Sequence, residues 1–170
     1  WSLSCAAVFL SFGLVTGVIL WETRGGLSAD RPECTEIFGV PVHTVFSPET
    51  LPGRPGIKRE VKFIVIHETG SPSEGADAKA HSDYLLNGGE GTTSWHYTVD
   101  DHEIYHHIPD SEVSWNAGDR RQEPGGNMNG ISIELCVNQD GDFEKTLDNG
   151  ERLTAYLMKE SDLKLDDVQT

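Results

Sequence analysis

Two segments of the chain have the pattern of buried strands. VKFIVIHET (residues 61–69) contains a continuous run of apolar, largely β-branched residues, which is typical of a strand buried on both faces of a sheet. GISIELCVN (130–138) predicts a second buried strand. SWHYTVD (94–100) and EIYHHIP (103–109) flank a polar turn and predict a hairpin. GVPVHTVF (39–46) predicts a short strand, and Pro41 favours a place at the edge of the sheet because proline cannot donate to the ladder.

Two further segments have helical patterns. ADAKAHSDYLLNGG (76–89) begins with Asp77 as a candidate N-cap and stops at a glycine pair. TLDNGERLTAYLMKESDL (146–163) is amphipathic, with Thr146 as a candidate cap and an inward apolar face at Leu147, Leu153, Tyr156 and Leu157. Strands therefore alternate with helices around one hairpin, which predicts an α/β fold with a mixed central β-sheet flanked by helices.

The N-terminal part differs from the rest of the chain. Residues 1–21 contain no charged residue and carry a tryptophan at each end, and at about 1.5 Å per residue this length matches the core of a bilayer. We interpret the segment as a transmembrane anchor or signal-anchor; the alternative is a signal peptide that is removed. Residues 22–53, rich in glycine, proline and charge, are interpreted as a linker and an N-terminal arm.

All charged residues lie from Glu22 onward, so the net charge of −15 belongs to that part of the chain. This acidity argues against nucleic acid as a partner, since phosphates attract Lys and Arg. The motifs GxSxG, GxGxxG and the Walker loop are absent, and His67 is followed by ETGS rather than by an HExxH pattern. These observations exclude several enzyme classes without selecting one.

Two residues of the buried strands are candidates for chemistry. His67 closes the first strand, where side chains open toward the loops, and its imidazole is either a zinc ligand or simply a polar residue at a strand end. Glu134 lies in the middle of the second strand, where a carboxylate is costly unless it is paired. Its role is either that of a general base or that of a partner in a structural salt bridge.

Three other residues are weaker candidates. His96 lies in SWHYTVD, and its position alone favours a surface or packed histidine over a ligand. Trp115 and Asn116 belong to the turn-like segment SWNAGD, where an exposed tryptophan stacks on sugar and a buried one fills the core.

The order of the motifs is more specific than any one of them. In sequence they are RPG (54–56), FIVIHETG (63–70), AKAHSDYL (78–85), SWHYTVDD (94–101), IYHHIPD (104–110), SWNAGD (114–119), GISIELCVNQDGD (130–142) and TLDNGERLTAYL (146–157). This series resembles the amidase-2 family of N-acetylmuramoyl-L-alanine amidases, which is related to phage endolysins and peptidoglycan recognition proteins. The resemblance covers residues 54–170, which we take as the amidase-2 domain.

The resemblance implies roles for individual residues. His67 matches the zinc-binding histidine of the family and Glu134 its catalytic carboxylate, while His96, Trp115 and Asn116 fall in segments that line the substrate cleft. Asn116 replaces the family's usual histidine. The family's other two zinc ligands follow the last helix, so the resemblance implies ligands beyond Thr170 and a domain truncated at its C-terminal end.

The implied activity is zinc-dependent hydrolysis of the amide bond between N-acetylmuramic acid and L-alanine in bacterial peptidoglycan. The cofactor would be Zn²⁺, and the partner the glycan strand with its stem peptide. The alternative is a peptidoglycan-binding module that does not cut. Such a substrate implies a single-pass protein of the cell membrane whose catalytic domain faces the cell wall, or a secreted protein if residues 1–21 are cleaved.

Overall fold

A computed structural model describes residues 34–170 of the chain. The predicted anchor at residues 1–21 and most of the linker, residues 22–33, lie outside this range, so the anchor stays a prediction. Within the described range, no helix has the length and apolar character needed to span a bilayer.

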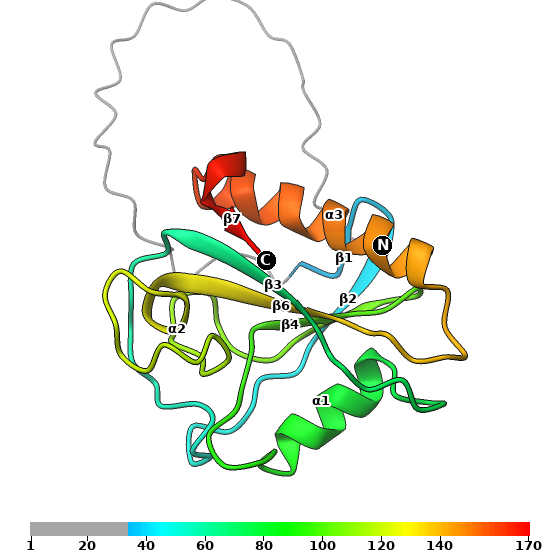
Figure 1. Ribbon diagram of the computed structural model, residues 1–170, viewed down its shortest axis with the longest axis horizontal. Coiled ribbons are helices and arrows are strands. Elements are labelled where there is room, and N and C mark those ends of the chain that lie inside the picture. Colours follow the sequence, from blue (N-terminus) through cyan, green and yellow to red (C-terminus); the bar gives the residue numbers. More distant parts are fainter. Residues whose placement is uncertain (1–33) are drawn as a thin grey trace, which may run out of the picture.

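The described part of the chain folds around one seven-stranded sheet with the order β1-β2-β5-β4-β6-β3-β7 (Figure 1). The elements are β1 (Glu36–Ile37), β2 (Val40–Thr44), β3 (Phe63–Glu68), α1 (Ala78–Leu86), β4 (Tyr97–Val99), β5 (Ile104–His106), α2 (Gly126–Asn129), β6 (Gly130–Leu135), α3 (Phe143–Glu160), the 3-10 helix η1 (Leu165–Asp167) and β7 (Val168–Gln169).

The two predicted buried strands are neighbours in this sheet. β3 and β6 run parallel over six residue pairs, from Phe63 opposite Gly130 to Glu68 opposite Leu135. β4 pairs parallel to β6 on the other side and antiparallel to β5, which confirms the predicted hairpin. β7 runs parallel to β3. The sheet is therefore mixed, as predicted.

The outer part of the sheet differs from the prediction in one respect. β2 pairs parallel with β5, but the two-residue strand β1 covers its other side, with Glu36 opposite Pro41. The edge position predicted for Pro41 is therefore wrong by one strand. Two residues of β1 form too short a pattern to be found from the sequence.

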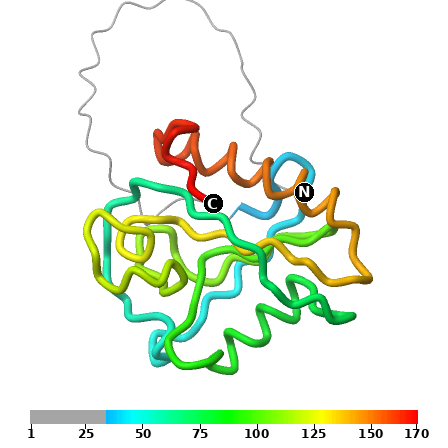
Figure 2. Tube along the Cα trace, viewed as in Figure 1, coloured from blue at the N-terminus to red at the C-terminus, as the bar shows by residue number. Residues whose placement is uncertain are grey.

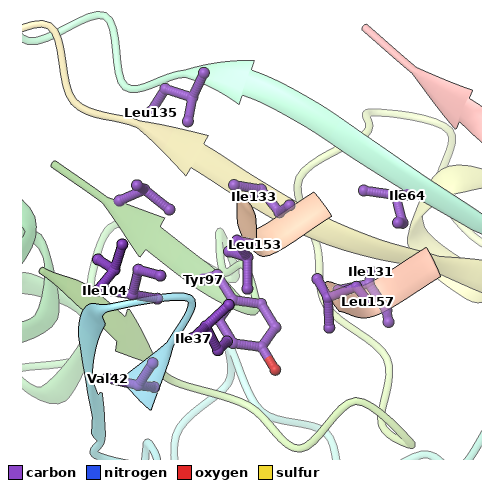
Figure 3. Close-up of a cluster of buried hydrophobic side chains, with 12 residues drawn as sticks. Ile37, Val42, Ile64, Tyr97, Ile104, Ile131, Ile133, Leu135, Leu153 and Leu157 are labelled. Carbon is purple, nitrogen blue, oxygen red and sulfur yellow. The ribbon is translucent and has the colours of Figure 1, made fainter. Parts of the chain in front are cut away.

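Helices cover both faces of the sheet (Figures 1 and 2). α3 lies over one face, and the hydrophobic core fills the space beneath it, where Leu153 and Leu157 meet Ile131 and Ile133 of β6 (Figure 3). All four of these side chains are fully buried. α1 lies over the opposite face, against β4 and β5. Since side chains alternate along a strand, Ser132 and Glu134 point to the face that α1 covers.

Both long helices begin at an aspartate. The side chain of Asp77 accepts a hydrogen bond from the Ala80 backbone, which confirms it as the cap of α1. α3 begins earlier than predicted because Asp142, not Thr146, caps it by accepting from the Lys145 backbone. Thr146 is buried inside the first turn and donates its hydroxyl to the Asp142 carbonyl instead.

Candidate active site

His67 and Glu134 face each other across β3 and β6. They are direct partners in the parallel register, so their side chains leave the sheet on the same face. Nδ1 of His67 lies 3.6 Å from Oε1 of Glu134, too far for a good hydrogen bond. The His67 side chain is 37% exposed and that of Glu134 12%. The pair thus lies at the carboxyl end of the central strands, with the imidazole open and the carboxylate recessed.

The surroundings of Glu134 disfavour its charge. Burial raises the pKa of this carboxyl from its ordinary value of 4.5 to about 7. No hydrogen bond joins its oxygens to any other residue in the range 34–170, and the contact with His67 is its one ion-pair partner there. Within the described residues no Lys or Arg forms a salt bridge with Glu134 that would make this glutamate a purely structural group.

His67 offers one nitrogen of a kind that zinc prefers. A tetrahedral site needs three or four protein ligands, and His67 belongs to no group of three histidine, cysteine or acidic side chains within residues 34–170. The group of that kind found in this range, Asp100, Asp101 and His102, forms the turn of the hairpin after β4. Asp100 there already accepts bonds from the backbones of His102 and Glu103. The described residues therefore fit zinc at His67 in ligand type but not in number.

His96 lies in the interior instead of on a surface. It is fully buried, and its two ring nitrogens contact Ser132, Ser114 and the carbonyl of Glu112. In this conformation the ring has no access to a ligand outside the fold. Contact between His96 and substrate stays a prediction that its burial does not favour.

Trp115 and Asn116 are both partly buried and lie in the segment beside β4. The Trp115 backbone pairs with Ser94, and the Arg121 guanidinium lies 5.7 Å from the Trp115 ring centre. The amide oxygen and nitrogen of Asn116 are both buried and have no hydrogen-bond partner among the described residues. An amide left in this way is costly, so it is a natural group for binding a polar ligand.

A cavity of about 430 Å³ lies on the same face of the sheet as the His67–Glu134 pair. It is lined by Thr69, Ser71, Ala76, Ala80, His81, Tyr84 and Trp95. Thr69 follows His67 by two residues, and its buried hydroxyl has no hydrogen-bond partner in residues 34–170. Sequence reasoning missed His81 and Tyr84 as site residues; their spacing of three on α1 is the signal that places them on one face of the helix.

Comparison with known proteins identifies the family of this chain. The family model "N-acetylmuramoyl-L-alanine amidase" matches residues 57–169, about two thirds of the chain. The chain therefore belongs to the N-acetylmuramoyl-L-alanine amidase family, in its amidase-2 branch. This result confirms the resemblance drawn from the order of the motifs.

Individual relatives are similar over the same part of the chain. The N-acetylmuramoyl-L-alanine amidases CwlH and XlyA of Bacillus subtilis (strain 168) are 42% and 45% identical over 123 residues. Each match covers 72% of this chain but only 48% and 40% of the relatives, so the chain spans less than half of their length.

Solved structures share the fold. The catalytic domain of XlyA superposes with a TM-score of 0.73 at 43% identity, over 76% of this chain and 83% of that domain. The catalytic domain of PlyG superposes with a TM-score of 0.68 at 23% identity, over 77% and 78% of the two chains. The second likeness concerns the fold alone.

Proposed function

We propose that this protein hydrolyses the amide bond between N-acetylmuramic acid and L-alanine in bacterial peptidoglycan, with zinc bound at His67. Family membership and the names of the relatives support the reaction class. The observation that carries the proposal is the placement of His67 beside a recessed glutamate whose pKa is raised to about 7. A carboxylate of that pKa is well matched to proton transfer near neutral pH.

The zinc ligands besides His67 are part of the proposal. β7 runs parallel to β3, with Val168 opposite Ile64 and Gln169 opposite Val65. The strand therefore leads toward His67, and we propose that residues following Thr170 supply the remaining ligands. A zinc ion held there would polarise the attacking water and the scissile carbonyl.

The described residues supply the proton transfers. The Glu134 carboxylate accepts the proton of the attacking water and then donates it to the nitrogen of the leaving L-alanine. Burial of the carboxylate raises its pKa and keeps it basic enough for the first step. The same raised pKa makes the protonated form a competent acid for the second step.

Substrate contacts are proposed for the face that α1 covers. The cavity beside Thr69, Tyr84 and Trp95 has room for part of a stem peptide or sugar. The Thr69 hydroxyl and the Asn116 amide have no hydrogen-bond partner among residues 34–170, and a bound ligand would supply one. Trp115, the residue before Asn116, is proposed to stack on a sugar ring.

Peptidoglycan lies outside the cell membrane, so we also propose that the domain acts there. Residues 1–21 would hold it at the membrane as a single-pass anchor, or would be removed from a secreted protein. Recovery of the intact chain from washed membranes supports the anchor, whereas a shortened, soluble product supports cleavage.

The test of the reaction uses the full-length protein and purified peptidoglycan. We expect the wild type to release newly exposed L-alanine amino groups. Glu134→Gln should reduce that rate by about 10² to 10⁴, the usual contribution of a general acid–base residue, and leave bound zinc unchanged. Glu144→Gln, an exposed carboxylate in the first turn of α3, is the matched control and should act like the wild type.

Two results would reject the proposal. A wild type that binds peptidoglycan and releases no amino groups would support the non-catalytic binding module instead. A fully active Glu134→Gln variant would remove the assigned role of the carboxylate.

A further inference from the structure

His96 is the centre of a buried polar cluster that the proposed reaction does not use. The cluster consists of His96, Ser114, Ser132, Arg59 and the carbonyl of Glu112. His96, Ser114 and Ser132 are all fully buried. They come from three separate parts of the chain: the entry to β4, the segment before Trp115, and β6.

The hydrogen bonds fix the tautomer of the His96 ring. The backbone N–H of Ser132 donates to Nδ1 at 3.0 Å, so Nδ1 carries a lone pair. In the neutral ring the hydrogen is then on Nε2, which donates to the Glu112 carbonyl at 2.9 Å. Burial, with the nearby Arg59 charge, lowers the pKa of His96 to about 3, so the ring is neutral at physiological pH.

Arg59 completes the cluster without bonding to the ring. Its Nε donates to the Glu112 carbonyl at 2.7 Å, the same oxygen that accepts from His96. Its Nη2 lies 3.0 Å from Nε2 of His96, but a protonated Nε2 cannot accept, so this is a contact between two donors. One carbonyl thus holds both side chains against the 112–115 segment.

The serine hydroxyls close the other side of the ring. Oγ of Ser132 and Oγ of Ser114 lie 2.9 and 3.1 Å from Nδ1 of His96, and 2.9 Å from each other. The His96 backbone N–H also points to Oγ of Ser132 at 3.1 Å. The ring therefore joins β6 to the 112–115 segment: Nδ1 contacts Ser132 and Ser114, and Nε2 donates to the Glu112 carbonyl.

Both joined segments carry residues of the proposed active site. Glu134 follows Ser132 by two residues on the same face of β6, about 6.6 Å along the strand. Trp115 and Asn116 directly follow Ser114. A shift of either segment would move one side of the site relative to the other.

We infer that His96 is a positioning residue that sets β6, and with it Glu134, against the segment carrying Trp115 and Asn116. This inference rests on the proposed function and gives His96 a role other than contact with substrate. A displacement of about 1 Å at a reacting group costs on the order of 10² in rate, so the effect of losing the ring falls on kcat.

The experiment compares three replacements of His96 in the full-length protein. Asn places an oxygen near the position of Nδ1 and keeps the acceptor for Ser132; Gln places an amide N–H near the position of Nε2 and keeps the donor to Glu112; Ala keeps neither. We expect His96→Ala to lower kcat about 10²-fold with KM unchanged. We expect His96→Asn to retain more of kcat than His96→Gln, because the Nδ1 side holds the strand of Glu134.

The experiment includes a control variant and a substitute for the case that His96→Ala does not fold. His43→Asn makes the same exchange at a half-exposed histidine on β2, three strands away from β6, and should leave both constants unchanged. If His96→Ala does not fold, Ser114→Ala removes a single hydroxyl of the cluster and should lower kcat to a smaller degree.

A second measurement does not depend on turnover. The carboxyl carbon resonance of Glu134, observed by NMR, should shift in His96→Gln and stay near its wild-type position in His96→Asn. A rise in KM at constant kcat in His96→Ala would show substrate contact and overturn the inference, as would a Glu134 resonance that none of the variants moves. A wild type that releases no L-alanine amino groups would reject the proposed function instead, and the resonance would still test the positioning.

Discussion

β6 carries two buried polar side chains on one face, Ser132 and Glu134, and their surroundings are opposite. Ser132 is fully buried, and its hydroxyl and backbone are both bonded to His96. Glu134 is 9% exposed and has no hydrogen bond to the rest of the described chain. Buried polar groups in proteins are almost always bonded, so the exception marks the group that has another use.

The same contrast separates the two histidines nearest to them. His96 beside Ser132 is enclosed and neutral, with both ring nitrogens occupied. His67 beside Glu134 has an open side chain, and its Nδ1 lies 3.6 Å from the carboxylate without a close bond. The imidazole of His67, near the end of β3, is therefore accessible, whereas both ring nitrogens of His96, at the entry to β4, already make contacts inside the fold.

The largest expected effect comes from removing His67. His67→Ala should abolish release of L-alanine amino groups and reduce bound zinc below detection, because one imidazole is lost from a site that needs all its ligands. Zinc content is measured by mass spectrometry of the purified full-length protein. His43→Ala removes an imidazole elsewhere and should change neither quantity. Full zinc binding by His67→Ala would place the metal at another site.

The second prediction concerns the stability cost of Glu134. The pKa of Glu134 in the folded state is about 7, above the ordinary value of 4.5. Between pH 4.5 and pH 7 the carboxyl is therefore protonated in the folded state and ionised in the unfolded state. The wild type should therefore lose on the order of 3 kcal/mol, relative to Glu134→Gln, as the pH rises from below 4.5 to above 7. Urea unfolding with a chelator present measures the difference at both pH values. A gap that is the same at pH 4 and pH 8 would contradict the raised pKa.

Periodicity was sufficient to predict the scaffold of this site. The apolar residues around His67 and Glu134 predict two buried strands, and parallel strands bring their carboxyl ends to the same edge. What periodicity does not give is the register. Only the structure shows that His67 and Glu134 are direct partners, because one residue of slippage would place them on opposite faces.

The third prediction concerns Ser132, the polar side chain of β6 that is hydrogen-bonded. Ser132→Ala removes the hydroxyl that bonds to His96 and Ser114 and leaves a buried ring nitrogen and hydroxyl less well paired. We expect a loss of about 2 kcal/mol in the free energy of unfolding, independent of pH between 5 and 8. Thermal and urea unfolding give this value. Glu134→Gln should show the opposite sign above pH 7, and a stabilising Ser132→Ala would remove the distinction between the two positions.

The positioning role inferred for His96 could not be predicted from the sequence. A histidine in phase with the polar side of a strand has the same pattern whether it meets solvent, substrate or a buried serine. Its partners Ser114 and Ser132 lie 18 and 36 residues away, and serines give no periodic signal. The ion pairs of Glu112 could not be predicted either, because its buried carboxylate is bound by Arg54 and Lys58, which lie more than fifty positions earlier in the chain.

The smallest expected effect is at Asn116, whose buried amide has no hydrogen-bond partner among residues 34–170. Asn116→Leu keeps the approximate shape and removes the cost of the two unpaired amide atoms, so it should stabilise the fold by about 1 kcal/mol. If the amide binds substrate, KM should rise at the same time, since a site group that pairs only with ligand has been lost. If Asn116→Leu stabilises the fold and leaves KM unchanged, the amide does not bind substrate. If the variant is less stable than the wild type, the amide has a hydrogen-bond partner in solution. The resemblance aligns Asn116 with a histidine of the family, so Asn116→His separates these cases further. If the imidazole forms hydrogen bonds only with substrate, KM should fall and the free energy of unfolding should not change.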